Sequence, residues 1–326
     1  MPELARTLRF DIWAGVLLDS VTLLNIGGSF RHGVSADWMP RMLDIEYREG
    51  DAVQMSALAR QAVPVDSLGV NLGGRLEHSV RYRDIYRPLG LGDELRVLLR
   101  DGGRAWGALV LVRSGELPPF SPAELAFAAG LSQPLGRLLR RTSIGAPGPD
   151  GLARSGLVVL AADYSPLSLS ATAEGWFAEL AEEPARGRGL PASVYSVAAA
   201  ALRNGAAGAR ACVPTRAGGL AAIEGWRLDG GEGVQVALSV GPAAPSDQVS
   251  RLIHSYGLSE RECEVLAQVL RGASTAQISR SLSLSPYTVQ DHLKAVFDKT
   301  GVRSRRELVG QVFFRDYHGL LGFGPD

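Results

Sequence analysis

Cysteine is scarce in this chain of 326 residues, which contains only Cys212 and Cys263. Two cysteines cannot build a disulfide framework or a four-cysteine metal site, and the five histidines lack the spacing of metal ligands. We therefore expect no metal and no cofactor, core positions for both cysteines, and a reducing, cytoplasmic environment.

Long hydrophobic runs are also missing. The most apolar stretch near the start, residues 10–18, is too short to cross a bilayer and contains Asp11. Because no small-residue cleavage site follows it, we expect neither a membrane span nor export. Hydrophobic residues make up 46% of the chain and charged residues 21%, which is ordinary for a globular protein, and the length predicts two or three domains.

An excess of either charge is absent too, since 34 basic residues balance 34 acidic ones. Zero net charge argues against a protein whose whole surface binds nucleic acid. Lysine is rare: the basic residues are arginines except for Lys294 and Lys299, which lie five residues apart on one predicted helix. Unless this spacing is a coincidence, it indicates positions that need a compact, flexible ammonium group.

Stretches rich in glycine and proline divide the chain. We interpret residues 142–153 and 241–247 as linkers and residues 319–326 as a tail. Three domains would then occupy residues 1–141, 154–240 and 248–318.

The first segment has the pattern of a mixed α+β domain. Strand-like runs at residues 94–100 and 105–113 are joined by Asp101-Gly102-Gly103, a hairpin signal, and earlier strands are predicted near residues 10–18 and 22–28. Ser121, with Pro122 and Glu124, predicts a capped helix. This order resembles a GAF domain, although the opening helix of that fold is nearly absent from the sequence.

The helix predicted from Pro122 to Arg141 carries an apolar stripe and then a basic end. The stripe consists of Leu125, Ala128, Leu131, Leu135 and Leu139, and the basic end of Arg137, Arg140 and Arg141. Such a stripe could pack in the domain core, in a subunit interface, or partly in both. We favour a helix that serves both.

The middle segment begins with a strand at residues 157–161, a turn at residues 163–166 and helices near residues 172–180 and 191–203. Three further strands follow, at residues 209–214, 220–228 and 234–240. This order resembles a PAS domain. Many PAS domains have asparagine before the first helix, where this chain has Ser170.

The last segment contains four predicted helices that are each preceded by a serine. A capping side chain satisfies backbone N–H groups at the helix start and is worth about 1 kcal/mol. Ser259 with Glu262, Ser274 with Gln277 and Ser304 with Glu307 are capping boxes, and Ser285 precedes Pro286. The helices are predicted at residues 260–271, 275–282, 286–299 and 305–315, and the second and third are joined by a turn of helix-turn-helix length.

The third of these helices has two different faces. Its apolar face, which should pack against the first two helices, consists of Val289, Leu293, Val296 and Phe297. The opposite face carries hydrogen-bond donors and acceptors suited to base edges: Tyr287, Asp291, Lys294 and Asp298, with Gln290 on the flank. Arg303, Arg305 and Arg306, at the start of the fourth helix, suit contacts to phosphates.

This segment closely resembles the LuxR/FixJ family of helix-turn-helix domains. The shared positions are Leu258–Glu262, Val265, Leu266, Gly272, Ile278, Leu282, Leu284, Ser285, Thr288, Val289, His292, Leu293, Lys299, Gly301, Val302, Ser304 and Arg305. The resemblance implies that the third helix enters the major groove of double-stranded DNA, with Gln290, Asp291 and Lys294 facing the bases. The implied DNA-binding set is Tyr287, Thr288, Gln290, Asp291, His292, Lys294, Lys299, Arg303 and Arg305. Family members often have lysine where this chain has Gln290, which predicts a different sequence preference.

Some of these residues allow a second interpretation. Asp291 and Asp298 could pair with Lys294 on a solvated helix face. His292 could pack between helices, and Tyr287 could pack on the turn instead of touching DNA.

The whole chain resembles actinobacterial regulators that have sensor-like N-terminal domains and a LuxR-type C-terminus. We expect a multidomain α+β protein with a GAF-like domain, a PAS-like domain and an all-α helix-turn-helix domain. Walker, G-x-S-x-G and kinase motifs are absent, so a transcription regulator and not an enzyme is predicted. The implied partners are DNA, a second copy of the chain, RNA polymerase and an unidentified small-molecule effector.

Two hypotheses remain for the N-terminal domains. In the first, a cavity binds a small molecule and the effect reaches the DNA-binding domain. In the second, these domains supply only a dimer or docking surface. Stabilisation by a metabolite would favour the first, and a filled core with a large apolar subunit interface the second. An analogy of fold does not choose between them.

Overall fold

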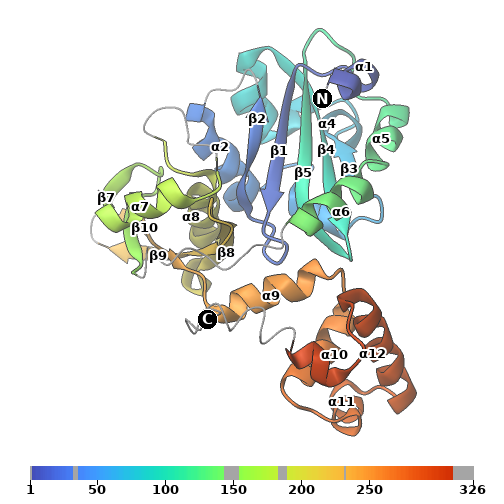
Figure 1. The fold of residues 1–326 in the computed structure, drawn as a ribbon. Helices are drawn as coiled ribbons and strands as arrows, with labels where there is room; N and C mark the ends of the chain where they lie inside the picture. The colour runs from blue at the N-terminus through green and yellow to red at the C-terminus, as the bar shows by residue number, and fades with distance from the viewer. Residues whose placement is uncertain (1, 32–35, 143–153, 183–188, 231–232, 311–326) are drawn as a thin grey trace. The chain divides into compact units, whose positions relative to one another are not determined.

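The computed structural model describes residues 2–31, 36–142, 154–182, 189–230 and 233–310. The chain forms two compact units, one of residues 1–139 with 148–242 and one of residues 140–147 with 243–326. The predicted tail and most of the predicted linker at 142–153 lie outside the described residues. Figure 1 shows the helices and strands of both units.

The first unit begins with a five-stranded antiparallel sheet in the order β2-β1-β5-β4-β3. Its strands are β1 (Ile12–Leu18), β2 (Asn25–Arg31), β3 (Val65–Ser67), β4 (Leu91–Asp101) and β5 (Arg104–Ser114). The predicted hairpin is confirmed. Gly102 and Gly103 join β4 to β5 with φ values of 61° and 76°, the left-handed backbone that a tight two-residue hairpin turn requires.

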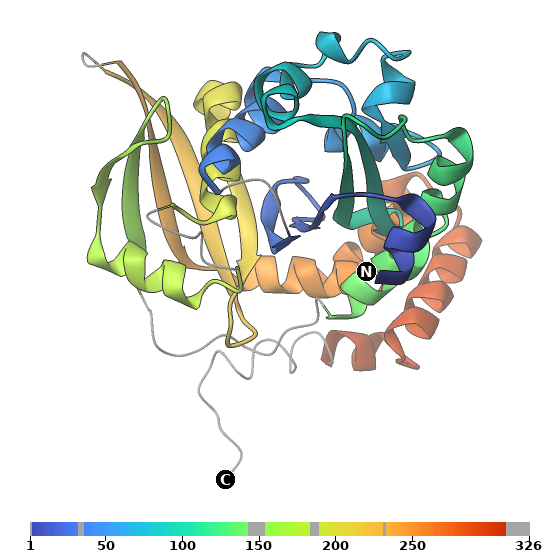
Figure 2. The same cartoon turned by 90° about the horizontal axis from the view of Figure 1, so that it is seen from above.

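Helices cover both faces of this sheet, as Figure 2 shows from above. One face packs against α2 (Met39–Asp44), the π-helical turn η2 (Ile45–Glu49), α3 (Met55–Arg60) and α4 (Leu68–Asn71). The other packs against α1 (Pro2–Leu8), α5 (Pro122–Ala129) and α6 (Ser132–Thr142). The opening helix is therefore present, although it is short.

The helix predicted from Pro122 to Arg141 is interrupted, and the expectation of one long helix was wrong. The predicted capping box of Ser121 and Glu124 starts α5, which ends before Gly130, and α6 begins at Ser132. A Cβ atom at Gly136 would lie 2.4 Å from the backbone of Arg100, so α6 lies directly on β4.

A second antiparallel sheet follows in the first unit, with the order β7-β6-β10-β9-β8. Its elements agree closely with the predicted ones: β6 (Gly156–Ala161), β7 (Pro166–Leu169), α7 (Ala171–Glu179), α8 (Ala192–Asn204), β8 (Ala209–Pro214), β9 (Leu220–Gly230) and β10 (Gly233–Pro242). In sequence order this is the same strand arrangement as in the first sheet. Ser170, where many PAS domains have asparagine, caps α7 by accepting a hydrogen bond from the Ala173 N–H.

The two sheets of this unit share a hydrophobic core instead of forming separate bodies. Leu24, Ile26 and Leu43 are buried in the same cluster as α7, α8 and the inner face of the second sheet. A polar contact joins the two parts as well, because the buried Tyr164 hydroxyl donates to Asp44. Arg48 also holds Asp44, with its Nε 2.7 Å from Oδ1.

The second unit contains α9 (Pro245–Ser255), α10 (Glu260–Leu270), α11 (Thr275–Leu282) and α12 (Pro286–Thr300). Residues 305–310 are also helical, and the rest of the predicted fourth helix lies outside the described residues. The boundary between the two units falls inside the segment predicted as a linker, residues 241–247, but most of this segment is structured, because β10 continues to Pro242 and α9 starts at Pro245. Asp247 stabilises this start by accepting the Ala244 N–H at 2.8 Å.

Candidate nucleic-acid interface

Serine side chains start α10, α11 and α12 as predicted. Ser259 and Ser274 form capping boxes with Glu262 and Gln277, and the Ser285 hydroxyl accepts the Thr288 N–H at 3.1 Å. Between α11 and α12 the chain turns at Ser283, whose φ of 54° and ψ of 43° are left-handed. These local features make α11 end sharply at Leu282 and α12 begin at Pro286, after a turn of three residues, which is helix-turn-helix geometry.

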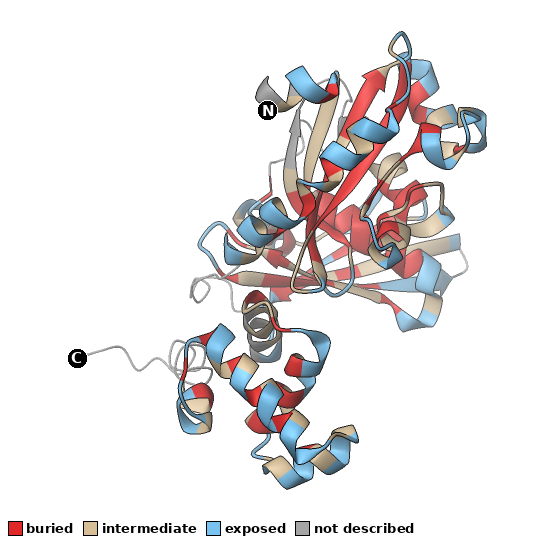
Figure 3. Ribbon diagram, turned by 90° about the vertical axis from the view of Figure 1, so that its right-hand side faces the viewer, coloured by how far each residue is buried: buried red, intermediate tan, exposed pale blue. Residues whose placement is uncertain are grey.

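The apolar face of α12 holds the unit together. Val289 and Val296 are fully buried and Leu293 is 4% exposed. They pack with the predicted partners on α10 and α11, which are Val265, Leu266, Val269, Ile278 and the half-buried Leu282. Figure 3 shows buried and exposed residues alternating along these helices. The predicted inward face is therefore confirmed, and the position of the outward face follows from it.

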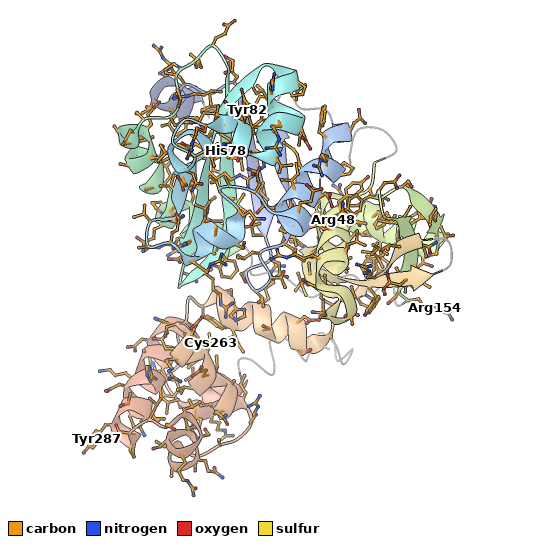
Figure 4. The ribbon with its side chains drawn as sticks, turned by 180° about the vertical axis from the view of Figure 1, so that it is seen from behind. Arg48, His78, Tyr82, Arg154, Cys263 and Tyr287 are labelled. Carbon is orange, nitrogen blue, oxygen red and sulfur yellow. The ribbon has the colours of Figure 1, made fainter. Side chains whose placement is uncertain are left out.

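The outward face of α12 is polar. Tyr287 is 86% exposed, and its side chain projects away from the domain in Figure 4. Gln290, Asp291 and Lys294 are exposed as well, whereas His292 is half-buried. Packing of Tyr287 on the turn is inconsistent with this exposure. One helix thus presents a phenol, an amide, a carboxylate and an ammonium group, which together can recognise base edges and phosphates.

Lys294 is free of the intrahelical ion pairs that the sequence allowed. Over the residues that the structure describes, no salt bridge joins it to Asp291 or Asp298. Its ammonium group therefore remains available for an external anion.

Lys299 differs from Lys294 because its ammonium group is already paired. Its Nζ lies 2.6 Å from Glu262 Oε2. Partial burial opposes ionisation of Glu262, but Lys299 and the Ser259 N–H hold its pKa below the ordinary value. This contact joins the end of α12 to the start of α10, which is a structural role that the sequence did not indicate.

Two other predicted contact residues are also bonded within the unit. The Thr288 hydroxyl lies 2.9 Å from the Ser285 hydroxyl, and Arg305 Nη1 donates to the Ala273 carbonyl at 2.6 Å. Arg305 thereby supports the loop between α10 and α11. Arg303 and Arg306 are exposed at the same end of the unit.

The cysteines are less buried than expected, since both are only partly buried. Cys263 packs at the edge of the core of the second unit, and Figure 4 shows it on α10. Among the described residues, no group of three or more histidine, cysteine, aspartate or glutamate side chains could hold a metal ion. No described helix is both long and apolar enough to span a membrane.

A buried ionic cluster in the first unit was missed by the sequence analysis. Arg81 Nη1 lies 2.8 Å from Glu94 Oε1, and Arg81 Nη2 lies 3.3 Å from Glu46 Oε2. Arg96 Nη1 lies 2.5 Å from the same Glu46 oxygen, and Arg96 also contacts Glu94. The buried Tyr86 hydroxyl donates to Glu94. Two cations and two carboxylates alternate, so the cluster is neutral.

Burial by itself would raise the pKa of Glu94, but Arg81, Arg96 and the Tyr86 hydroxyl hold it below its ordinary value. Burial and the neighbouring carboxylate raise the pKa of Tyr86, which stays protonated as a donor. The sequence signal was the presence of Glu94 and Arg96 in a predicted strand, residues 94–100, that is otherwise mainly apolar.

The second unit thus defines a helix-turn-helix domain of the kind that binds DNA. Residues 256–312 match the model of the bacterial regulatory proteins of the luxR family, and residues 3–139 match the model of the GAF domain. The chain therefore has a LuxR-family DNA-binding domain and a GAF domain, as the two sequence resemblances implied.

Curated relatives match over short stretches of the chain. The chain is 32% identical over 77 residues to the HTH-type transcriptional regulator MalT of Serratia proteamaculans, covering 24% of this chain and 8% of that protein. It is 36% identical over 65 residues to MalT of Yersinia pestis, covering 20% of this chain and 7% of that protein. The chain thus spans less than a tenth of the length of these curated relatives.

Among solved structures, the chain is similar to the VqmA dimer of Vibrio cholerae, at 14% identity and a TM-score of 0.22, covering 49% of this chain and 82% of that one. A VqmA–ligand–DNA complex matches at 17% identity and a TM-score of 0.23, covering 50% and 83%. TM-scores this low do not establish a common overall fold.

Proposed function

We propose that this protein is a transcription regulator that binds double-stranded DNA as a homodimer. The observation that carries this proposal is the outward face of α12, where Tyr287, Gln290 and Lys294 are exposed on a helix whose other face is buried. Such a helix fits the major groove, and a twofold dimer doubles the limited interface of one small domain. The proposed DNA-binding domain comprises residues 248–318.

Replacing Lys294 by alanine should weaken DNA binding by about 1–3 kcal/mol, because an exposed ammonium group is lost without leaving a cavity. Titration of operator DNA with the full chain at about 150 mM salt measures this effect. Lys299→Ala is the matched control, since it removes the same charge from the same helix. Its effect on affinity should be smaller, because Lys299 is paired with Glu262. Unchanged affinity in Lys294→Ala, with unchanged circular dichroism, would remove Lys294 from the interface.

Gln290 should determine sequence preference more than total affinity. Its amide can form two hydrogen bonds with adenine, whereas a lysine donates to guanine O6 and N7. We therefore expect Gln290→Lys to shift the selected operator towards guanine at one position of each half-site. Selection from a randomised DNA pool gives the two sequence logos for comparison. Identical logos would show that Gln290 does not read the bases.

For the first unit we propose a sensor role in which a small molecule alters DNA binding. The GAF domain at residues 3–139 supports this role. We further propose that residues 154–240 are a PAS-like domain, supported by the strand order β7-β6-β10-β9-β8, which repeats the order of the GAF sheet. Screening metabolites for a raised melting temperature of the full chain tests the sensor role.

A further inference from the structure

The second sheet of the first unit has an apolar outer face. Paired residues of antiparallel strands point to the same side, so the register defines this face. One row contains Leu157, Ser239, Glu224 and Arg210, the next Val159, Ala237 and Trp226, and the third Ala161, Gln235 and Leu228. We call these ten residues the outer sheet face.

Six of the ten residues are apolar, and yet three of these are exposed while the other residues of the face are half-buried. Leu157 is 62% exposed, Trp226 43% and Leu228 42%. None of the ten belongs to a hydrophobic cluster formed by the described residues. Their sequence neighbours Val158, Leu160 and Leu238, which point to the other side of the sheet, lie in such a cluster and are at most 1% exposed. A sheet with one solvated face normally alternates apolar and polar residues. The continuous apolar run of β6, Leu157-Val-Val-Leu-Ala161, is instead typical of a strand covered on both sides.

We propose that the outer sheet face is the dimer interface and that its occupant is the same face of a second copy. The proposal specifies the surface for the homodimer proposed above and rests on it. The ten residues lie on four of the five strands. The whole outer side of the sheet, at about 4.8 Å per strand and about 3.3 Å per residue along the six residues of β6, measures roughly 24 by 20 Å. Two such faces provide close to the ~1,000 Å² at the lower end for specific interfaces.

The charges of the face also fit a second copy. Its two ionic residues, Arg210 and Glu224, lie at one end, 2.8 Å apart and partly exposed. Because a twofold dimer brings together identical patches, each copy supplies one cation and one anion, and the cation of one copy can face the anion of the other. The central row is uncharged, as in the core of protein interfaces. Because the charges of Arg210 and Glu224 cancel, the face has no net charge that would attract a strongly charged partner such as nucleic acid.

Sedimentation of the full chain, without DNA and over a range of concentrations, tests the proposal. We expect a dimer for the natural chain and a monomer for Leu157→Glu and Leu228→Glu. A buried unpaired carboxylate at the interface should raise the dimer dissociation constant by a factor on the order of 100 or more. Both leucines are exposed in the monomer, so the variants should keep the melting temperature of the isolated fold.

Two variants serve as matched controls. Val63→Glu and Leu138→Glu change apolar residues of the first unit that are 57% and 56% exposed but lie outside the outer sheet face, and both should remain dimeric. Dimeric Leu157→Glu and Leu228→Glu would overturn the proposal, and a monomeric Leu138→Glu would place the interface on α6. Unfolding of Leu157→Glu would show that a segment of the same chain covers the face, again against the proposal. A monomeric natural chain would contradict the homodimer itself, and DNA titration shows separately whether the chain binds DNA.

Discussion

Glu94→Gln should lower the free energy of unfolding of the first unit by about 3–5 kcal/mol, the effect typical of removing one partner from a buried ion pair. Glu94 is fully buried and accepts contacts from Arg81, Arg96 and Tyr86. Without its charge, two buried guanidinium groups would face the single carboxylate of Glu46. Urea unfolding followed by circular dichroism measures the loss.

Glu49→Gln is the control for this variant. Glu49 also pairs with an arginine, Arg41, at 2.6 Å, but both side chains are about one-third exposed. A pair that water screens in this way contributes at most about 1 kcal/mol. Equal losses in the two variants would show that burial does not determine the contribution of the cluster.

The same cluster should make the first unit sensitive to acid. The pKa of Glu94 is lowered in the folded state, so its contribution to stability is complete above the unfolded-state value of about 4.3. This contribution is lost as the pH falls through the lower, folded-state pKa. In Glu94→Gln the decrease in stability below about pH 4 should therefore be shallower than in the natural chain.

Leu139→Glu should destabilise the first unit by several kcal/mol, because it would place a carboxylate against the sheet. Leu139 packs into the cluster of α1, α5 and the sheet, and its Cδ1 lies 2.7 Å from the position of a Cβ atom at Gly107. This packing agrees with the core part of the expectation that the leucine stripe serves both core and interface, whereas the interface part stays a prediction. The other leucines of the stripe, Leu125, Leu131 and Leu135, also pack against the hydrophobic cluster of their own domain.

The adjacent Leu138 is the natural control for this variant. It is 56% exposed, so Leu138→Glu should change the melting temperature little. Thermal unfolding of both variants, combined with sedimentation, separates the two interpretations of the stripe. A folded but monomeric Leu139→Glu would support the interface interpretation.

Local signals in the sequence were sufficient for most helices and strands. Serine caps placed the starts of α5, α10, α11 and α12 correctly, because a cap acts within three residues of the helix start. The start of α9 was missed, although Pro245 and Asp247 are ordinary signals for a helix start. The glycine and proline nearby led to the interpretation as a linker.

The sequence by itself determined which residues of α12 face outwards, because helical periodicity relates residues only a few positions apart. The tertiary structure alone decided which of the candidate cations are already bonded. Lys299 pairs with a carboxylate 37 residues away, and Arg305 bonds a carbonyl 32 residues away. It also decided that Glu46, Arg81, Glu94 and Arg96 meet in one buried cluster. Contacts of this kind depend on how whole helices and strands pack. Local sequence patterns relate residues only a few positions apart, so they do not predict which distant residues come within bonding distance.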